Sequence, residues 1–210
     1  MTSTPTVFLV DDQGAILKAL SRLLASAGFD VMAFESAEDF LDAGHHDAPG
    51  CLVLDLSMPG MNGLALQTAL AQRACVLPLI FLTGHGDIDS GITAMKLGAL
   101  DFLTKPVDDE RLIGAVRVAI DKNRVLRQAQ RERVSILARL ASLTPREREV
   151  LDLLVEGKLN KQVAAQLGTV EKTVKVHRAR VMTKMQVRSL TALVRLVDAV
   201  AARRVGEDIG

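Results

Sequence analysis

Reactive side chains follow four of the five short apolar runs in the first half of the chain. Asp11 and Asp12 come after the first run, Asp55 after the third, Thr83 after the fourth and Lys105 after the fifth. Alone, an aspartate after such a run is typical of a turn or a helix cap, and a lysine of a solvated charge. Three carboxylates, a hydroxyl and an ammonium in succession are instead the groups that handle Mg²⁺ and phosphate.

These residue types predict a site for covalent phosphorylation of an aspartate. Clustered carboxylates repel one another unless a cation lies among them, and an oxygen-rich site of this kind suits Mg²⁺. Asp55 directly ends its apolar run and is the best candidate for the carboxylate that attacks a phosphoryl group. Lys105 would supply a fixed positive charge for the phosphoryl oxygens, and Thr83 would supply a hydrogen-bond donor.

A parallel sheet would bring these residues together. The expected strands are Val7–Val10, Val31–Phe34, Cys51–Leu54, Leu79–Leu82 and Leu100–Leu103. Segments of helical period separate them, with Ser36 and Asn62 as predicted N-caps and Gly28 as a predicted stop. Continuous apolar strands are typical of sheets covered on both faces. The pattern predicts an α/β doubly wound five-stranded parallel sheet, which binds ligands at the carboxyl ends of its strands.

The two halves of the chain carry opposite charge. Residues 1–120 hold 15 acidic and 7 basic side chains, a net −8, whereas residues 121–210 hold 10 acidic and 19 basic ones, a net +9. A basic half predicts a polyanionic partner. All six Phe lie in the first half and the chain has no Tyr or Trp. The basic half therefore has no ring on which an unpaired base could stack, which favours duplex DNA.

The basic half is predicted to be all-α. Residues 121–142 read as a helical linker that continues the fifth helix of the first half, and Thr144 with Glu147 predicts a capping box. Four helices should follow, at Pro145–Glu156, Asn160–Leu167, roughly Val170–Met185 and Ser189–Ala201. The turn at Gly168-Thr169 makes the middle pair a helix-turn-helix motif. Six Lys or Arg and one acid between 169 and 188 suit the helix that enters the major groove.

Other compartments and scaffolds are disfavoured. No apolar run approaches the roughly 20 residues that span a bilayer. The start of the chain lacks the pattern of a signal peptide, and two cysteines are too few for a disulfide framework. A cytoplasmic protein with no membrane partner is expected.

The first half resembles the receiver domain of bacterial response regulators over about residues 5–120. The resemblance rests on VDD at 10–12, LDLSMPGMNG at 54–63, LTGHG at 82–86 and FLTKP at 102–106. It implies that Asp55 accepts a phosphoryl group from a sensor histidine kinase. It also implies Mg²⁺ held by Asp12, Asp55 and the backbone carbonyl of Ser57, with Asp11 behind them, and a cis bond before Pro106. Beyond its own phosphorylation and dephosphorylation at Asp55, no enzyme activity is expected.

The second half resembles the LuxR-type DNA-binding domain, through LTPREREVL at 143–151, NKQVA at 160–164 and TVKVHR at 173–178. The whole chain is thus similar to the NarL/FixJ family, on its FixJ-like branch. The implied domains are 1–120, 121–142 and 143–210. The resemblance implies base contacts by Lys175, Val176 and Ala179. It implies phosphate contacts by Asn160, Lys161, Lys172, Thr173, Arg178 and Arg180. Relatives often have a capping Ser at the position of Val170, where this chain has a residue that cannot cap, so Thr169 is an alternative N-cap.

A switch follows from the same resemblance. Phosphorylation would draw Thr83 inward, and Phe102 would follow, unless Phe102 is simply a core residue. The changed surface would then form a homodimer contact that includes Ile92, Met95, Lys96 and Asp101. His85, close to Thr83, either tunes dephosphorylation or lines its loop. RNA polymerase is a further candidate partner on promoter DNA.

Two other functions compete with this one. A phosphohydrolase with an aspartyl nucleophile would need a second acid two residues after Asp55, where the chain has Ser57. A one-component transcription factor that senses a small ligand would leave the acidic cluster and Lys105 without a role.

Overall fold

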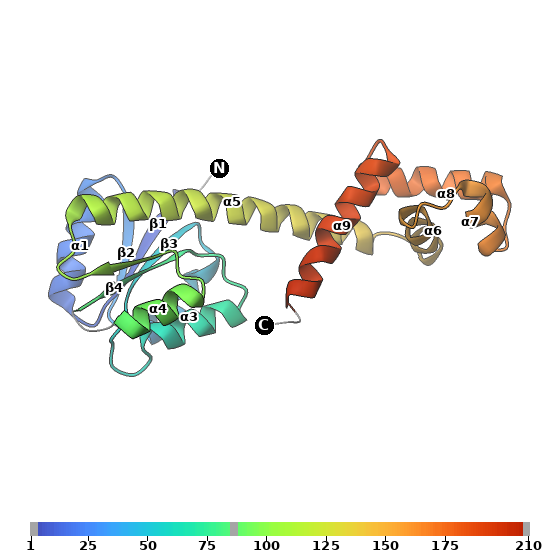
Figure 1. Cartoon of the computed structure of the whole chain (residues 1–210). Helices are drawn as coiled ribbons and strands as arrows, with labels where there is room; N and C mark the ends of the chain where they lie inside the picture. The colour runs from blue at the N-terminus through green and yellow to red at the C-terminus, as the bar shows by residue number, and fades with distance from the viewer. Residues whose placement is uncertain (1–3, 85–87, 208–210) are drawn as a thin grey trace. The chain divides into compact units, whose positions relative to one another are not determined.

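The computed structural model describes residues 4–84 and 88–207 and divides the chain into two compact units, Met1–Gln128 and Ala129–Gly210. Figure 1 shows the elements of each. The strands are β1 Thr6–Val10, β2 Asp30–Phe34, β3 Gly50–Asp55, β4 Leu79–Thr83 and β5 Asp101–Thr104. The helices of the first unit are α1 Gly14–Ser26, α2 Ala37–Asp42, the short 3₁₀ helix η1 His45–Asp47, α3 Gly63–Gln72, α4 Ile88–Lys96 and the start of α5 Asp109–Ala141.

The five strands form one parallel sheet in the order β2-β1-β3-β4-β5. This confirms the predicted doubly wound fold. Residues of β1 and β3 are buried almost throughout, as expected for strands that are covered on both faces. Because every connection runs from the end of one strand to the start of the next parallel strand, the carboxyl ends all meet at one edge.

Two apolar cores lie on the two faces of the sheet. One contains Phe8 and Leu52 with residues of α2, α3 and α4, such as Phe40. The other contains Leu9 and Val53 with residues of α1 and α5. Alternate residues of each strand thus enter opposite cores, which follows from the two-residue period of a strand.

Local signals at the helix ends operate as predicted. The side chain of Ser36 accepts a hydrogen bond from the backbone of Asp39, and Asn62 accepts one from Ala65. Gly28, just after α1, has a φ of +90°, which favours glycine over residues with a side chain.

The α5 helix continues well past the sheet. Its Asn123 is buried, accepts a hydrogen bond from the Gly50 backbone at 3.1 Å and donates one to the Val76 carbonyl at 2.9 Å. Arg127 also donates to the Asp47 carbonyl. The stretch after residue 120 reads as polar in the sequence, yet these side chains attach it to the first unit.

The second unit contains the end of α5 and four further helices. They are α6 Pro145–Val155, α7 Asn160–Gln166, α8 Glu171–Lys184 and α9 Leu190–Glu207. The predicted capping box is present, because Thr144 accepts from the Glu147 backbone while the Glu147 carboxylate accepts from the Thr144 backbone. A core that includes Val150, Val163 and Val174 holds α6, α7 and α8 together.

Several boundaries differ from those predicted, most of them by one or two residues, and the start of α8 and the end of α9 are the most informative. The N-cap of α8 is Val170, whose side chain makes no capping bond, so Thr169 does not take the capping position. The last helix extends to Glu207 instead of ending at 201, since no Gly or Pro interrupts it before Gly206. Within residues 4–84 and 88–207, no helix combines the length and apolarity needed to cross a membrane.

Candidate functional site

Three carboxylates meet at the carboxyl edge of the sheet. One oxygen each from Asp11, Asp12 and Asp55 lies within 4.8 Å of the others. Asp11 and Asp55 are almost fully buried, whereas Asp12 is exposed. Asp11 and Asp12 follow β1 and Asp55 ends β3, and these two strands are paired neighbours, so the sheet register brings the acids together. A set of three close carboxylates, two of them withdrawn from water, fits a divalent metal ion.

Lys105 completes this cluster. Its ammonium lies 2.6 Å from the Asp11 carboxylate and 3.2 Å from that of Asp55. The lysine follows β5, two strands away from β3, and the Lys105-Pro106 peptide is cis. A fixed positive charge therefore touches two of the three acids.

Opposing effects act on the Asp55 carboxyl. Burial raises its pKa most, and the Lys105 charge and hydrogen bond oppose that rise. The neighbouring Asp11 raises the pKa further, whereas a backbone hydrogen bond from Ser57 lowers it. The net direction is upward, and Lys105 is the main group that favours the charged form of this carboxyl.

Thr83 and Phe102 lie on the two strands next to β3. Thr83 is buried at the end of β4, and its hydroxyl donates to the Gly84 carbonyl at 3.3 Å. Phe102 on β5 is half-buried and lies against Gly91 of α4, where a side chain of any size would overlap the ring. The ring borders a hollow of about 510 Å³ that is also lined by Gly91, Ile92, Met95 and Lys96. Asp101 instead faces a separate groove along α5, with Arg111 and Val118.

The loop after Asp55 is fixed by a residue that sequence reasoning missed. The Glu38 carboxylate on α2 accepts a hydrogen bond from the Met61 backbone at 3.0 Å. Glu38 lies in the first turn of a helix, where an acid is expected for helix stability alone, so no sequence signal marked this contact. His85 lies outside the described residues.

The second unit presents a basic helix face. On α8, Lys172, Lys175, Val176, Ala179 and Arg180 are all exposed. Lys161 on α7 is exposed too, and Thr173 is half-buried. The predicted base-contacting residues Lys175, Val176 and Ala179 recur at helical spacing along α8. This arrangement can insert into a DNA groove.

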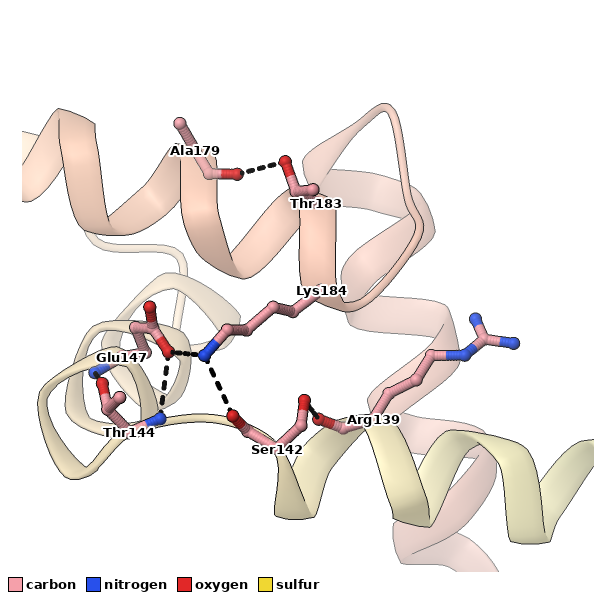
Figure 2. Close-up of polar contacts among 7 residues, drawn as sticks. All are labelled: Arg139, Ser142, Thr144, Glu147, Ala179, Thr183 and Lys184. Atoms are coloured by element: carbon pink, nitrogen blue, oxygen red, sulfur yellow. Dashed lines mark hydrogen bonds and ion pairs between the residues drawn. The ribbon is translucent and has the colours of Figure 1, made fainter.

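Some of the basic residues near this face have partners inside the protein. Arg178 donates to the Asn160 side chain at 3.2 Å, which joins α8 to the start of α7. Lys184 binds the buried Glu147 carboxylate at 2.6 Å, as Figure 2 shows. That contact and the Thr144 backbone lower the pKa of Glu147 to about 2. Lys184 belongs to the six basic residues between 169 and 188, but its ammonium pairs with the buried Glu147 carboxylate.

Family models match both units. Residues 7–117 match the response regulator receiver domain, and residues 141–197 match the luxR family of bacterial regulatory proteins. The chain is a FixJ-like response regulator. This combination of a receiver and a LuxR-type domain is that of a transcription regulator controlled by phosphorylation.

Relatives along the whole chain agree. Nodulation protein W of Bradyrhizobium diazoefficiens is 45% identical over 192 residues, covering 91% of this chain and 85% of that protein. The transcriptional regulatory protein FixJ of the same organism is 42% identical over 196 residues, covering 93% and 96%. Response regulator protein TodT of Pseudomonas putida is 44% identical over 193 residues, covering 91% and 85%.

Solved structures of full-length relatives give the same result. The response regulator StyR matches with a TM-score of 0.82 and 44% identity, covering 93% of this chain and 99% of that one. Full-length FixJ from B. japonicum matches with a TM-score of 0.58 and 40% identity, covering 96% and 99%. These relatives are regulators rather than enzymes, which does not favour the phosphohydrolase alternative. They are named as response regulators, which does not favour the one-component alternative. As a response regulator, this protein has a kinase as its partner and binds DNA.

Proposed function

We propose that Asp55 is the phosphoacceptor of this response regulator. The observation that supports this most is the ammonium of Lys105 in contact with both Asp11 and Asp55, inside a cluster of three carboxylates. Asp55 lies on the central strand of the sheet, and Lys105 favours the charged form of its carboxyl. A structural ion pair alone would not need a third acid on the exposed side of the cluster.

The transfer is a single displacement at phosphorus. A carboxylate oxygen of Asp55 forms a bond to the phosphorus of a phosphohistidine on the sensor histidine kinase. The P–N bond breaks, and its electron pair stays on the imidazole nitrogen, which takes a proton from water. The product is an acyl phosphate on Asp55. Lys105 balances the charge that the phosphoryl oxygens bring into the cluster.

The donor set fits Mg²⁺. Asp12, Asp55 and the backbone carbonyl of Ser57 would hold the ion, with Asp11 behind them. All are oxygen ligands, and the exposed position of Asp12 leaves room for the waters that Mg²⁺ retains. When bound, the ion supplies positive charge against the phosphoryl and carboxylate oxygens.

The activity that phosphorylation controls in this proposal is sequence-specific binding to double-stranded promoter DNA. Lys175, Val176 and Ala179 on the exposed face of α8 would contact base edges. Phosphate contacts would come from Asn160, Lys161, Lys172, Thr173, Arg178 and Arg180. Arg178 already bonds Asn160, so DNA would have to share or replace that contact.

The change of state is proposed to pass through Thr83 and Phe102. With the phosphoryl group attached, the Thr83 hydroxyl would turn toward it and the Phe102 ring would shift against Gly91. Ile92, Met95 and Lys96 line the same hollow as the ring and would form a homodimer surface. Asp101, which faces the separate groove along α5, would join it at the edge. The dimer would act on promoter DNA in the cytoplasm, with RNA polymerase as a further partner. The domains for these roles are 1–120, 121–142 and 143–210.

The test compares wild type with Asp55→Asn and, as a matched control, with Asp42→Asn at an exposed position on α2. Each protein is treated with acetyl phosphate and Mg²⁺, and phosphorylation is followed by mass spectrometry. Gel filtration reports dimers, and footprinting on a duplex selected from random sequence reports DNA binding. Wild type and Asp42→Asn should gain 80 Da, dimerise and bind more tightly, whereas Asp55→Asn should do none of these. Equal dimerisation and binding by Asp55→Asn would refute the assignment.

A further inference from the structure

Lys184 joins three segments of the second unit at one point. Its ammonium donates to the Glu147 carboxylate at 2.6 Å and to the Ser142 carbonyl at 2.9 Å, as Figure 2 shows. Glu147 belongs to the capping box of α6, and Ser142 directly follows the last residue of α5. Lys184 itself is the last residue of α8, the helix with the predicted DNA-reading face. The basic side chain thus binds the C-terminal end of the linker helix.

A second contact runs in the opposite direction. Arg139, in the last turn of α5, donates from its guanidinium to the Met185 carbonyl at 3.1 Å. Met185 is the C-cap of α8, so each of the two helices supplies a cation to the C-terminal end of the other. Exposed carbonyls at a helix C-terminus attract cations, so both contacts are favourable.

Apolar packing surrounds these polar contacts. Ile136 and Leu140 of α5 pack on a core that contains Val181 of α8 and its C-cap residue Met185. Glu147 is only 3% exposed, whereas about a third of the Lys184 side chain is exposed, so their ion pair is partly shielded from solvent. The last turns of α5 and the last turn of α8 therefore form one packed and hydrogen-bonded assembly, which we name the linker clamp: Arg139, Ser142, Glu147, Lys184 and Met185.

We propose that the linker clamp transmits the state of the linker helix to the recognition helix α8, with Arg139 and Lys184 as positioning residues that do not contact DNA. This inference rests on the proposed phosphorylation control. The end of α5 cannot change direction without moving the carbonyl that Lys184 binds and the guanidinium that holds Met185. Because both contacts are at the C-terminal end of α8, such movement would tilt the reading face of the helix.

The experiment uses the full chain with Arg139→Met, which removes the guanidinium but leaves the Lys184–Glu147 pair intact. Arg139→Lys keeps a donor for Met185 and serves as the conservative rescue. Arg131→Met, at an exposed position two turns earlier on α5, is the matched control for charge. Lys184→Met is a second clamp variant, and circular dichroism checks that each protein is folded. Affinity for a selected duplex is measured at several salt concentrations, with and without acetyl phosphate.

Two readouts decide the outcome. In Arg139→Met, the gain in affinity on phosphorylation should fall at least about threefold, whereas Arg139→Lys and Arg131→Met should keep the wild-type gain. The salt dependence of binding should stay as in wild type. A Lys172→Met variant, which removes a proposed phosphate contact, should instead lower the slope of log affinity against log salt by about 0.9.

Other results would overturn the proposal. If Arg139→Met and Lys184→Met are folded and phosphorylation raises their DNA affinity as much as it does in wild type, the clamp does not transmit the signal. If the clamp variants lower the slope of log affinity against log salt as Lys172→Met does, then Arg139 and Lys184 contact DNA. If phosphorylation does not raise the DNA affinity of wild type, the proposed function itself is wrong. That result differs from one in which phosphorylation raises the affinity of wild type and of the variants equally, which overturns only the role of the linker clamp.

Discussion

Two glycines within helices of the first unit should respond in opposite ways to the same substitution. Gly91 lies in α4 and Gly114 in α5, and neither has a positive φ. A Cβ built on Gly114 meets no atom within 4 Å, but one built on Gly91 lies 2.5 Å from the tip of the Phe102 ring. We predict that Gly114→Ala stabilises the unit and that Gly91→Ala destabilises it.

The magnitudes follow from two effects. Replacing glycine by alanine within a helix stabilises it by about 1 kcal/mol, and this gain applies to both positions. At Gly91 the ring must also move by roughly 1 Å to reach van der Waals distance, and overpacking of this kind costs about 1–3 kcal/mol. The expected difference in unfolding free energy between the two variants is therefore about 1–3 kcal/mol, with Gly91→Ala the less stable.

Urea unfolding of the full chain, followed by circular dichroism, measures this difference. Both positions belong to the same unit, so the same transition reports on both, and far-UV ellipticity is available in a protein without Trp or Tyr. Equal stabilisation by both variants, within about 0.5 kcal/mol, would show that Phe102 moves aside without cost. The reasoning from the α4–β5 contact would then be wrong.

Further predictions concern the buried polar groups. Asn123→Leu removes two hydrogen bonds to backbone groups and leaves the Gly50 amide buried and the Val76 carbonyl partly buried without this partner. The first unit should therefore lose about 2–5 kcal/mol, measured by hydrogen exchange of the β3 amides. Arg124→Ala, which breaks only an exposed ion pair with Asp121, should change it by under about 0.5 kcal/mol, and equal effects would contradict this account. The pKa of Glu147 is lowered from 4.5 to about 2, so its stabilising effect should be complete above about pH 4.5 and disappear as the pH falls through 2. The second unit of Glu147→Gln should therefore show a weaker loss of stability over this range than wild type in urea unfolding, and identical pH dependence would argue against the Lys184 contact.

Much of the fold and of the acidic cluster could be predicted because the signals are local. Continuous apolar runs mark buried strands, and the residue after each run necessarily lies at the carboxyl edge of a parallel sheet. The capping box at Thr144 and Glu147 also depends on residues three positions apart. The N-cap at Val170 was harder to predict, because its apolar side chain makes no capping bond and the backbone alone sets the start of α8.

The contacts between distant segments were not predictable in the same way. Asn123 looks like one more polar residue in a polar stretch, yet it binds the backbone 73 residues away at Gly50. Lys184 looks like part of a DNA-binding charge run, yet it is 37 residues from the Glu147 carboxylate that it neutralises. In each case the side chain type is ordinary, and only its contact with a distant segment gives it a role.

The amino-acid sequence by itself determined the order of strands and helices, the gathering of Asp11, Asp12, Asp55 and Lys105, and the opposite charges of the two halves. These properties follow from periodicity and residue type, which act over a few neighbouring positions. Only the tertiary structure decided which lysines face outward and how the end of α5 is held against α8. It also decided that residue 91 must be small, whereas residue 114 need not be. Packing makes these decisions, because whether a charge or a ring has a partner depends on residues that are distant in the chain and adjacent in space.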